Sequence, residues 1–198
     1  MIAAYAARVA DALSTLEAST SRGPLPADVA VKDLATAFAK THDAKRKVIF
    51  IGNGGSAAIA SHAAADYSAN GPVRAIALTD ASSVTCIAND YGYEHVFDRQ
   101  LQLHGDKGDV LVVISSSGES ENVVRAARSG RSLGLCVVSM TGFSAANRLR
   151  ALGQFNFWVP ASDYGIVETA HTALLHLLLN ELQALRGRAG RNGRHDKY

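Results

Sequence analysis

Five short runs of apolar residues, rich in Val and Ile, alternate along the chain with segments whose apolar residues recur every three or four positions. Runs that are apolar at every position predict strands buried on both faces, as in a parallel sheet covered by helices. The strands are expected at 47–52, 74–79, 109–115, 135–140 and 155–160. The helices that alternate with them are expected at 56–68, 94–104, 120–132, 144–152 and 165–186. The pattern therefore predicts an α/β fold, a three-layer α/β/α sandwich around a five-stranded parallel sheet.

The same helical spacing occurs at 2–18 and 26–42, on either side of the segment "STSRGPLPAD". The glycine and prolines of this segment end the first helix, and Asp28 is placed to cap the second. A chain of 198 residues cannot cover both helices with its own mass, and their Ala-rich faces permit close packing between subunits. We therefore expect an oligomer of one domain. Its expected parts are a domain over 1–186, with a helical pair at 1–44 and an α/β core at 45–186.

The distribution of charge along the chain argues against nucleic acid as a partner of the folded part. The net charge is +2, and most of the basic excess lies in the final segment "RGRAGRNGRHDKY". The rest of the chain is close to neutral and offers no field for nucleic acid. Residues 187–198 are rich in Gly and Arg and poor in apolar side chains, which predicts a disordered tail. Binding of RNA or of a membrane surface through this tail is the alternative.

The sequence carries no sign of export or of a membrane partner. Arg8 and Asp11 interrupt the first apolar residues, which therefore lack the pattern of a signal peptide. No run approaches the roughly 18 apolar residues of a membrane span. Cys86 and Cys136 lie far apart in apolar surroundings, which predicts buried, reduced thiols. These features predict a cytoplasmic protein.

Three loops follow expected strands, at the carboxyl edge where open parallel sheets bind ligands. They are "GNGGS" (52–56), "SSSGESEN" (115–122) and "TGFS" (141–144). The first lacks the third glycine of a dinucleotide fingerprint and the lysine of a P-loop, so no nucleotide is expected. The second brings Ser115, Ser116, Ser117 and Ser120 to the start of a helix, where hydroxyls and backbone N–H groups favour a phosphate. The alternative is that Ser117 or Ser120 only caps that helix.

Titratable groups recur within two apolar helices. His62 and Asp66 are four residues apart and share one face. Glu168, His171 and His176 lie on a helix otherwise rich in leucine. A lone histidine on such a helix is usually a core or interface residue, but several unpaired titratable groups would be costly to bury. They are therefore candidates for catalysis or metal binding.

Four segments, in order, carry a family resemblance: "GNGGSAAIASH", "AIALTDASSVTCIANDYGYEHVF", "GDVLVVISSSGESENVV" and "ETAHTALLHLL". From about residue 2 to residue 185 the chain resembles the sugar isomerase (SIS) domain family, and within it the phosphoheptose isomerases. The resemblance implies a flavodoxin-like sheet and a homotetramer with the leading helices in a central bundle and the sites between subunits. It also implies interconversion of sedoheptulose 7-phosphate and a heptose 7-phosphate. The implied cofactor is a divalent metal, Zn²⁺ first, with Mn²⁺ or Fe²⁺ as alternatives.

The resemblance also implies roles for individual residues. Asp66 and His176 match the acid and base. His62, Asp66, Glu168 and His176 match the surroundings of the metal. The positions expected to bind the sugar phosphate are Asn53, Gly54, Ser56, Asp90, Ser115, Ser116, Ser117, Ser120 and Glu168.

Two positions depart from the family pattern, which has Glu at position 66 and Gln at position 168. Asp66 withdraws the carboxylate by about 1 Å, a displacement that can cost about a hundredfold in rate. Glu168 adds an anionic oxygen that suits a divalent ion. However, Glu168 and His176 are separated by about 12 Å of helix rise, so both bind one ion only if their side chains converge or subunits share the site. The competing interpretation is a hydrogen bond between Glu168 and His171.

Two other functions stay open. One is isomerisation of a different sugar phosphate, accommodated by the changed acid. The other is a non-catalytic SIS module that binds a sugar phosphate or a protein partner. The presence of His62, His176 and carboxylates at both variable positions favours catalysis.

Overall fold

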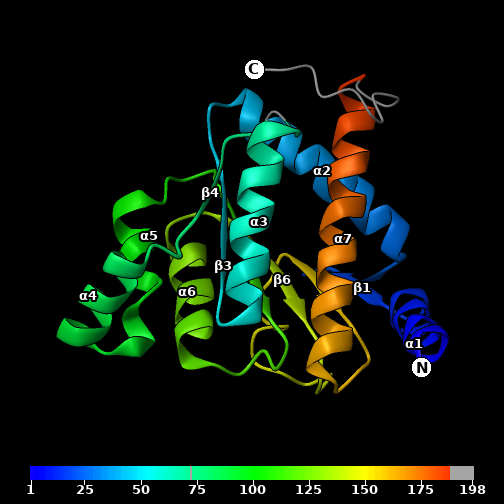
Figure 1. The fold of residues 1–198 in the computed structure, drawn as a ribbon. Coiled ribbons are helices and arrows are strands. Elements are labelled where there is room, and N and C mark those ends of the chain that lie inside the picture. The colour runs from blue at the N-terminus through cyan, green and yellow to red at the C-terminus, as the bar shows by residue number, and fades with distance from the viewer. Residues whose placement is uncertain (72, 188–198) are drawn as a thin grey trace.

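The computed structural model describes residues 1–71 and 73–187 (Figure 1). Its helices are α1 (Ile2–Ser14), α2 (Ala27–Asp43), α3 (Gly55–Ala69), α4 (Ala81–Tyr91), α5 (Asp98–His104), α6 (Glu121–Ser132) and α7 (Tyr164–Leu185), with a 3₁₀ turn η1 (Tyr93–His95). Its strands are β1 (Glu17–Thr20), β2 (Gly23–Leu25), β3 (Val48–Gly52), β4 (Ala75–Ala77), β5 (Val110–Ser115), β6 (Cys136–Thr141) and β7 (Phe155–Trp158). The basic segment expected to be disordered lies outside the described residues, apart from Gly187.

The strands form one sheet in the order β2-β1-β7-β6-β5-β3-β4. The five expected parallel strands, β3 to β7, are all present. The sheet nevertheless has seven strands, because β1 and β2 form an antiparallel hairpin whose first strand pairs with β7.

The expected helix 2–18 is therefore too long. It ends at Ser14, and the residues from Glu17 onward form β1. Its apolar spacing fitted a helix, but β7 offered an open edge, and pairing there buries Ala18. Tertiary contact decided the structure of this short segment over its local pattern.

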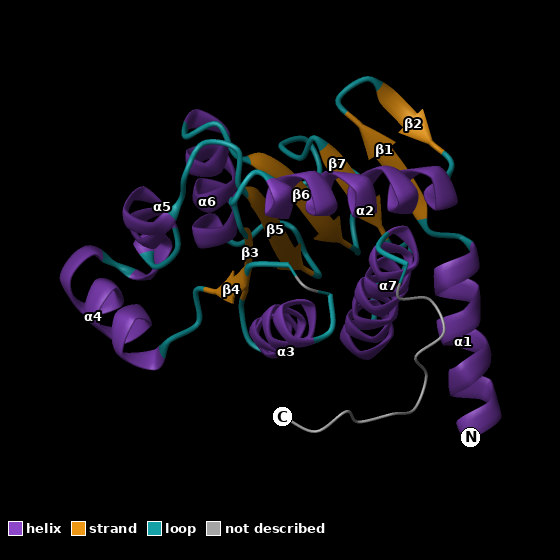
Figure 2. Cartoon of the chain, turned by 90° about the horizontal axis from the view of Figure 1, so that it is seen from above, coloured by secondary structure: helices purple, strands orange, loops and turns teal. Residues whose placement is uncertain are grey.

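Helices cover both faces of the sheet. Alternate strand residues point to opposite sides, so Val48, Phe50 and Val112 pack with α2, α3 and α7. Ile49 and Leu111 pack on the other side with α5 and α6. Seen from above, the sheet runs between α5 and α6 on one side and α3 and α7 on the other (Figure 2). The predicted three-layer sandwich is confirmed.

The structure also differs from the predicted elements outside the central sheet. The segment expected as a helix at 144–152 forms turns, because the Asn147 side chain takes up backbone groups: it donates to Ser144 O (2.8 Å) and accepts from Arg150 N (2.9 Å). The unexpected helix α4 is capped by Asp80 and has no buried residue. Cys86 on this helix is exposed, contrary to expectation.

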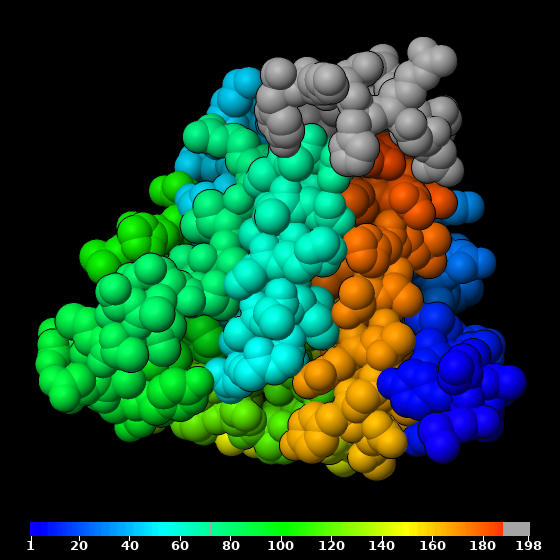
Figure 3. All heavy atoms as spheres, in the orientation of Figure 1, coloured from blue at the N-terminus to red at the C-terminus, as the bar shows by residue number. Residues whose placement is uncertain are grey.

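The surface of the α3 and α7 side is shown in Figure 3. The two helices lie side by side, and α1 lies beside the first half of α7. Most of α1 is exposed, including Ile2, Tyr5 and Leu13. No helix among the described residues is long and apolar enough to cross a membrane.

Candidate active site

A pocket of about 230 Å³ lies at the carboxyl ends of β3 and β5. These strands are neighbours in the sheet, but β3 leads through α3 to one side and β5 leads through α6 to the other. Such a switch in connection direction is where open α/β sheets bind ligands. We call this the serine pocket; it is lined by Asn53, Gly54, Gly55, Ser56, Ser115, Ser116, Ser117, Ser120, Tyr164 and Glu168.

The loop after β5 supplies hydroxyl groups to the serine pocket. Ser115 Oγ accepts from Gly118 N (3.1 Å) and Ser117 Oγ accepts from Glu119 N (3.3 Å), so each hydroxyl keeps its own hydrogen for a ligand. Ser120 lies at the N-cap of α6 without a side-chain capping bond. Helix capping therefore does not explain the serines. Ser116 Oγ is buried and has no hydrogen-bond partner among the described residues.

The turn after β3 brings backbone N–H groups to the same pocket. Gly54, with φ +53°, precedes α3 and provides no side-chain cap. The first residues of the helix line the pocket, so their uncapped N–H groups lie beside it. The carboxylate of Glu168 packs so closely on Gly55 that a Cβ there would overlap it. Among the residues described, no Lys or Arg lines the serine pocket, so its donors are neutral.

Asn53 is held by two residues that the sequence did not single out. Its amide exchanges two hydrogen bonds of 2.9 Å with the Asn122 amide, and Tyr93 donates its hydroxyl to Asn53 Oδ1 (3.1 Å). Asn122 is the last residue of the quoted segment "SSSGESEN", but its position one residue inside a helix gave no signal of a partner in another loop.

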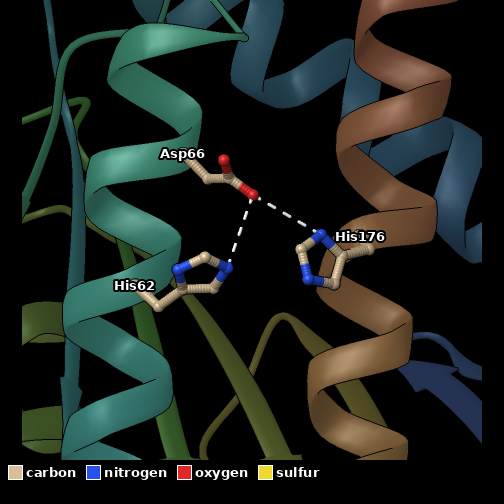
Figure 4. A group of neighbouring side chains, drawn as sticks. All are labelled: His62, Asp66 and His176. Atoms are coloured by element: carbon tan, nitrogen blue, oxygen red, sulfur yellow. Dashed lines mark ion pairs between the residues drawn. The ribbon is translucent and has the colours of Figure 1, made fainter. Parts of the chain in front are cut away.

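His62, Asp66 and His176 form a second cluster, here called the His–Asp group (Figure 4). His62 and Asp66 lie on one face of α3, as their spacing predicts, and His176 reaches them from α7. Asp66 Oδ2 lies 3.6 Å from His62 Nε2 and 3.5 Å from His176 Nδ1. The other oxygen, Asp66 Oδ1, accepts from Asn70 Nδ2 (2.8 Å), which fixes the carboxylate.

The His–Asp group has the chemistry of a divalent metal site. One ligand atom from each of the three residues lies within 4.8 Å of the others. Two imidazoles and a carboxylate are common ligands of zinc and of non-haem iron. Ligand atoms about 2.1 Å from a tetrahedral ion lie about 3.4 Å apart, close to the two distances at Asp66. The three residues therefore fit such an ion.

Three sequence-predicted residues lie apart from the His–Asp group. Glu168 is not part of the His–Asp group; it lies about two turns of α7 before His176 and lines the serine pocket, as the helix rise anticipated. His171 contacts Thr141 O rather than Glu168. Asp90 is exposed on α4, beside Asn89 and Cys86, and is not among the lining residues of the serine pocket.

Fold and site together define a doubly wound α/β protein with a pocket of neutral donors at its switch point. The chain belongs to the SIS domain family, whose sequence profile matches residues 4–142. Within this family it is similar to proteins named phosphoheptose isomerase. It is 39% identical to that of Rhodospirillum rubrum over 138 residues, which are 67% of this chain and 73% of that protein. It is 42% identical to one from Nitratidesulfovibrio vulgaris (strain Miyazaki F) over 154 residues, 75% of this chain and 74% of that protein.

Solved structures agree with this assignment. The structure of the phosphoheptose isomerase from Neisseria gonorrhoeae superposes with a TM-score of 0.80 at 30% identity, covering 92% of this chain and 97% of that one. The enzyme from Francisella tularensis gives a TM-score of 0.79 at 25% identity, covering 92% and 94%.

Proposed function

We propose that this chain is a phosphoheptose isomerase, which interconverts sedoheptulose 7-phosphate and a heptose 7-phosphate. The relatives at 39% and 42% identity carry that name. The observation that carries the proposal is that the serine pocket and the His–Asp group share one helix pair. The pocket lies at the starts of α3 and α7, and the His–Asp group lies about two turns further along α7. A substrate with a phosphate at one end and a reacting carbon at the other suits this arrangement.

The serine pocket binds the phosphate in this proposal. The hydroxyls of Ser115, Ser117 and Ser120 and the N–H groups at the starts of α3 and α6 are directed at it. Both helix dipoles favour an anion there. Glu168 lines the same pocket, and its carboxylate accepts hydrogen bonds from sugar hydroxyls. This orients the sugar chain away from the serines and along α7.

The isomerisation moves one proton from C1 of the ketose to C2, through an enediol, while the hydroxyl hydrogen passes from O1 to O2. It requires a base and an acid near these carbons. Asp66 Oδ2 faces Nδ1 of His176, which leaves Nε2 of that ring to take and return the carbon-bound proton. Asp66 either orients His176 or transfers the second proton itself.

A divalent ion, proposed as Zn²⁺ with Mn²⁺ or Fe²⁺ as alternatives, would be held by His62, Asp66 and His176 and would supply positive charge for the developing oxyanion. A group that holds the ion cannot also take the proton. If Asp66 holds the ion, His176 acts as base only when it is not itself a ligand, and otherwise a bound water carries the proton transfer. Glu168 would join these ligands only by moving out of the serine pocket or through a neighbouring subunit.

We also propose a homotetramer and a cytoplasmic location, as the resemblance and the sequence lead us to expect. Exposed apolar residues of α1 favour contact with further copies: Ile2, Tyr5 and Leu13. Asp90 does not line the pocket within one chain, which fits a site completed between subunits.

The direct test is incubation of the purified protein with sedoheptulose 7-phosphate, after its metal content has been measured. We expect conversion to the aldose, and loss of at least about a thousandfold in kcat for His176→Ala, because a general base is removed. His104→Ala is the matched control, since that histidine ends α5, far from the His–Asp group in the chain. No turnover of sedoheptulose 7-phosphate by the wild type, with or without added Zn²⁺ or Mn²⁺, would exclude a phosphoheptose isomerase.

The same assay separates the two alternatives. Turnover of a shorter or longer ketose phosphate, and not of sedoheptulose 7-phosphate, would assign a different substrate. Tight binding of these compounds with no turnover of any of them would indicate a non-catalytic SIS module.

A further inference from the structure

His171 is a histidine in the core with no place in the reaction above. Its side chain is completely buried on α7, in a helix face otherwise made of apolar residues. Desolvation lowers the pKa of His171 to about 4, so the ring is neutral near pH 7. A neutral imidazole buried at this depth is costly unless it makes a specific contact.

That contact is with one backbone carbonyl. His171 Nε2 lies 3.2 Å from Thr141 O, at the end of β6. A carbonyl only accepts, so Nε2 carries the proton and donates it. Nδ1 is then the acceptor nitrogen, and it has no partner among the described residues. The hydrogen bond to Thr141 is thus the polar contact that compensates for burying the imidazole of His171.

The carbonyl of Thr141 and the N–H of Gly142 belong to the same planar peptide unit. On its other side, this unit donates from Gly142 N to Ser116 O (2.9 Å). Val159 N also donates to Thr141 O (2.8 Å), so the peptide is held from β7 and from α7 together. A single rigid group therefore connects His171 to the wall of the serine pocket.

Close packing makes this connection stiff. A Cβ on Gly142 would lie 2.8 Å from both methyl groups of Val167, so α7 presses directly on the peptide. Ser116 lines the serine pocket, and its hydroxyl is buried without a partner among the described residues. The position of that hydroxyl therefore depends on the backbone at Ser116, which Gly142 holds.

We propose that His171 is a positioning residue: through the 141–142 peptide it places Ser116 for the phosphate of the substrate. The inference rests on the proposed function in that it takes the serine pocket as the phosphate site. His171 acts on binding of the phosphate and leaves the proton transfers at His176 unchanged.

The chain allows a matched pair of variants. Glutamine has its amide nitrogen the same number of bonds from Cα as His Nε2, whereas asparagine is one bond shorter and does not reach Thr141. The Kd for inorganic phosphate and the KM and kcat for sedoheptulose 7-phosphate are measured for both. We expect His171→Gln to stay near the wild type. We expect His171→Asn to weaken phosphate binding and raise KM by about three- to tenfold, the worth of one hydrogen bond, with kcat within about twofold.

Equal KM values for the two variants, or a loss confined to kcat, would overturn the role. If His171→Asn does not fold, the amide resonance of Gly142 is followed in the wild type during titration with inorganic phosphate. We expect it to shift and to exchange more slowly together with the amides of Ser116 and Ser117. A Gly142 amide that stays unchanged while those of the serines shift would also overturn it.

These experiments distinguish failure of the proposed isomerase function from failure of the role of His171. If the wild type binds phosphate without isomerising the sugar, the binding comparison still tests His171 while the isomerase proposal fails. If the wild type binds no phosphate, the serine pocket is not a phosphate site, and the role of His171 fails with it.

Discussion

Asp66 is the residue on which the His–Asp group depends most directly, because its two oxygens have separate tasks. Oδ1 is fixed by Asn70, and Oδ2 lies at nearly equal distances from His62 and His176. The sequence raised the concern that aspartate is one methylene too short. In the structure, the spacing between α3 and α7 already brings the shorter side chain between the two imidazoles.

We expect Asp66→Glu to lower the activity. The longer side chain pushes the carboxylate about 1 Å past its present position, and we expect kcat for sedoheptulose 7-phosphate to fall about ten- to a hundredfold. Steady-state kinetics measures this, with Asp33→Glu, the same change at an exposed aspartate of α2, as the control. A many-fold rise in turnover for Asp66→Glu would show instead that the native site is built for another phosphosugar.

We expect the buried ring of His171 to make the stability of the protein depend on pH. The folded state keeps this ring neutral down to a pKa of about 4, whereas the unfolded chain binds a proton near 6.5. The unfolded state therefore binds more protons between these values, and stability falls as the pH is lowered from about 6.5 toward 4. Over this whole interval, the protonation of His171 lowers the free energy of unfolding by about 3 kcal/mol.

Urea unfolding at pH 7.0, 6.0 and 5.0 measures the change. His171→Gln has no titrating ring and is expected to lose clearly less stability over the same range. Hydrogen bonds from Lys47 and Arg148 lower the pKa values of Asp106 and Glu121, and these carboxylates are present in both proteins, so the comparison with His171→Gln removes their contribution. Parallel curves for the wild type and His171→Gln would contradict the prediction.

The helix pair α3 and α7 is the element that assembles the site. Sequence periodicity placed His62 and Asp66 on one face of α3 and identified α7, but it could not show that the two helices are neighbours. That contact follows from sheet order, since α3 and α7 cover the same face and pack against shared strands. His176 therefore reaches Asp66 across 110 residues of sequence because of topology and not because of local pattern.

One hydrogen bond fixes the two helices against each other beside the His–Asp group. The hydroxyl of Tyr67, a buried residue of α3, donates to Leu175 O on α7 (2.7 Å). We expect Tyr67→Phe to lower the free energy of unfolding by about 1 kcal/mol and Tm by about 2–4 °C. We also expect it to lower kcat several-fold, since the residue after Asp66 loses its tie to the residue before His176.

Calorimetry and kinetics test the two parts of this prediction. Tyr5→Phe is the control, because its hydroxyl is exposed and makes only a 3.5 Å contact with Thr169. Full stability of Tyr67→Phe would show that the hydrogen bond does not hold the helix pair together.

Helix α1 lies at the edge of the fold, and little of its surface is covered by the rest of the chain. Ala12 is its only buried residue in the described structure, and its contacts are mainly with α7. The β1–β2 hairpin forms one edge of the sheet. The other end of the sheet, β4, has three residues and no further strand beside it among those described. The exposed apolar surface of α1 favours assembly through this helix.

We expect Leu13→Lys to disrupt the proposed homotetramer without unfolding the chain. Leu13 is 37% exposed, and a charge there costs little in a monomer but much in a bundle of apolar helices. Light scattering after size exclusion should show smaller species, with an unchanged circular dichroism spectrum. Asp11→Lys, on the opposite side of α1, should remain tetrameric. A monomeric wild type, or a tetramer that survives Leu13→Lys, would contradict this role of α1.

Local sequence patterns were enough to predict the layered α/β class, the five parallel strands, and the two glycine- and serine-rich loops. These features depend on local periodicity and on turn chemistry, which are properties of adjacent residues. The resemblance assigned His62, Asp66 and His176 to one centre. The tertiary structure was needed to show that Glu17–Thr20 is a strand, that Glu168 lies in the serine pocket and not in the His–Asp group, and that Asn122 and Tyr93 support Asn53. Each of these depends on which elements become neighbours, and sheet order is set by packing over the whole chain.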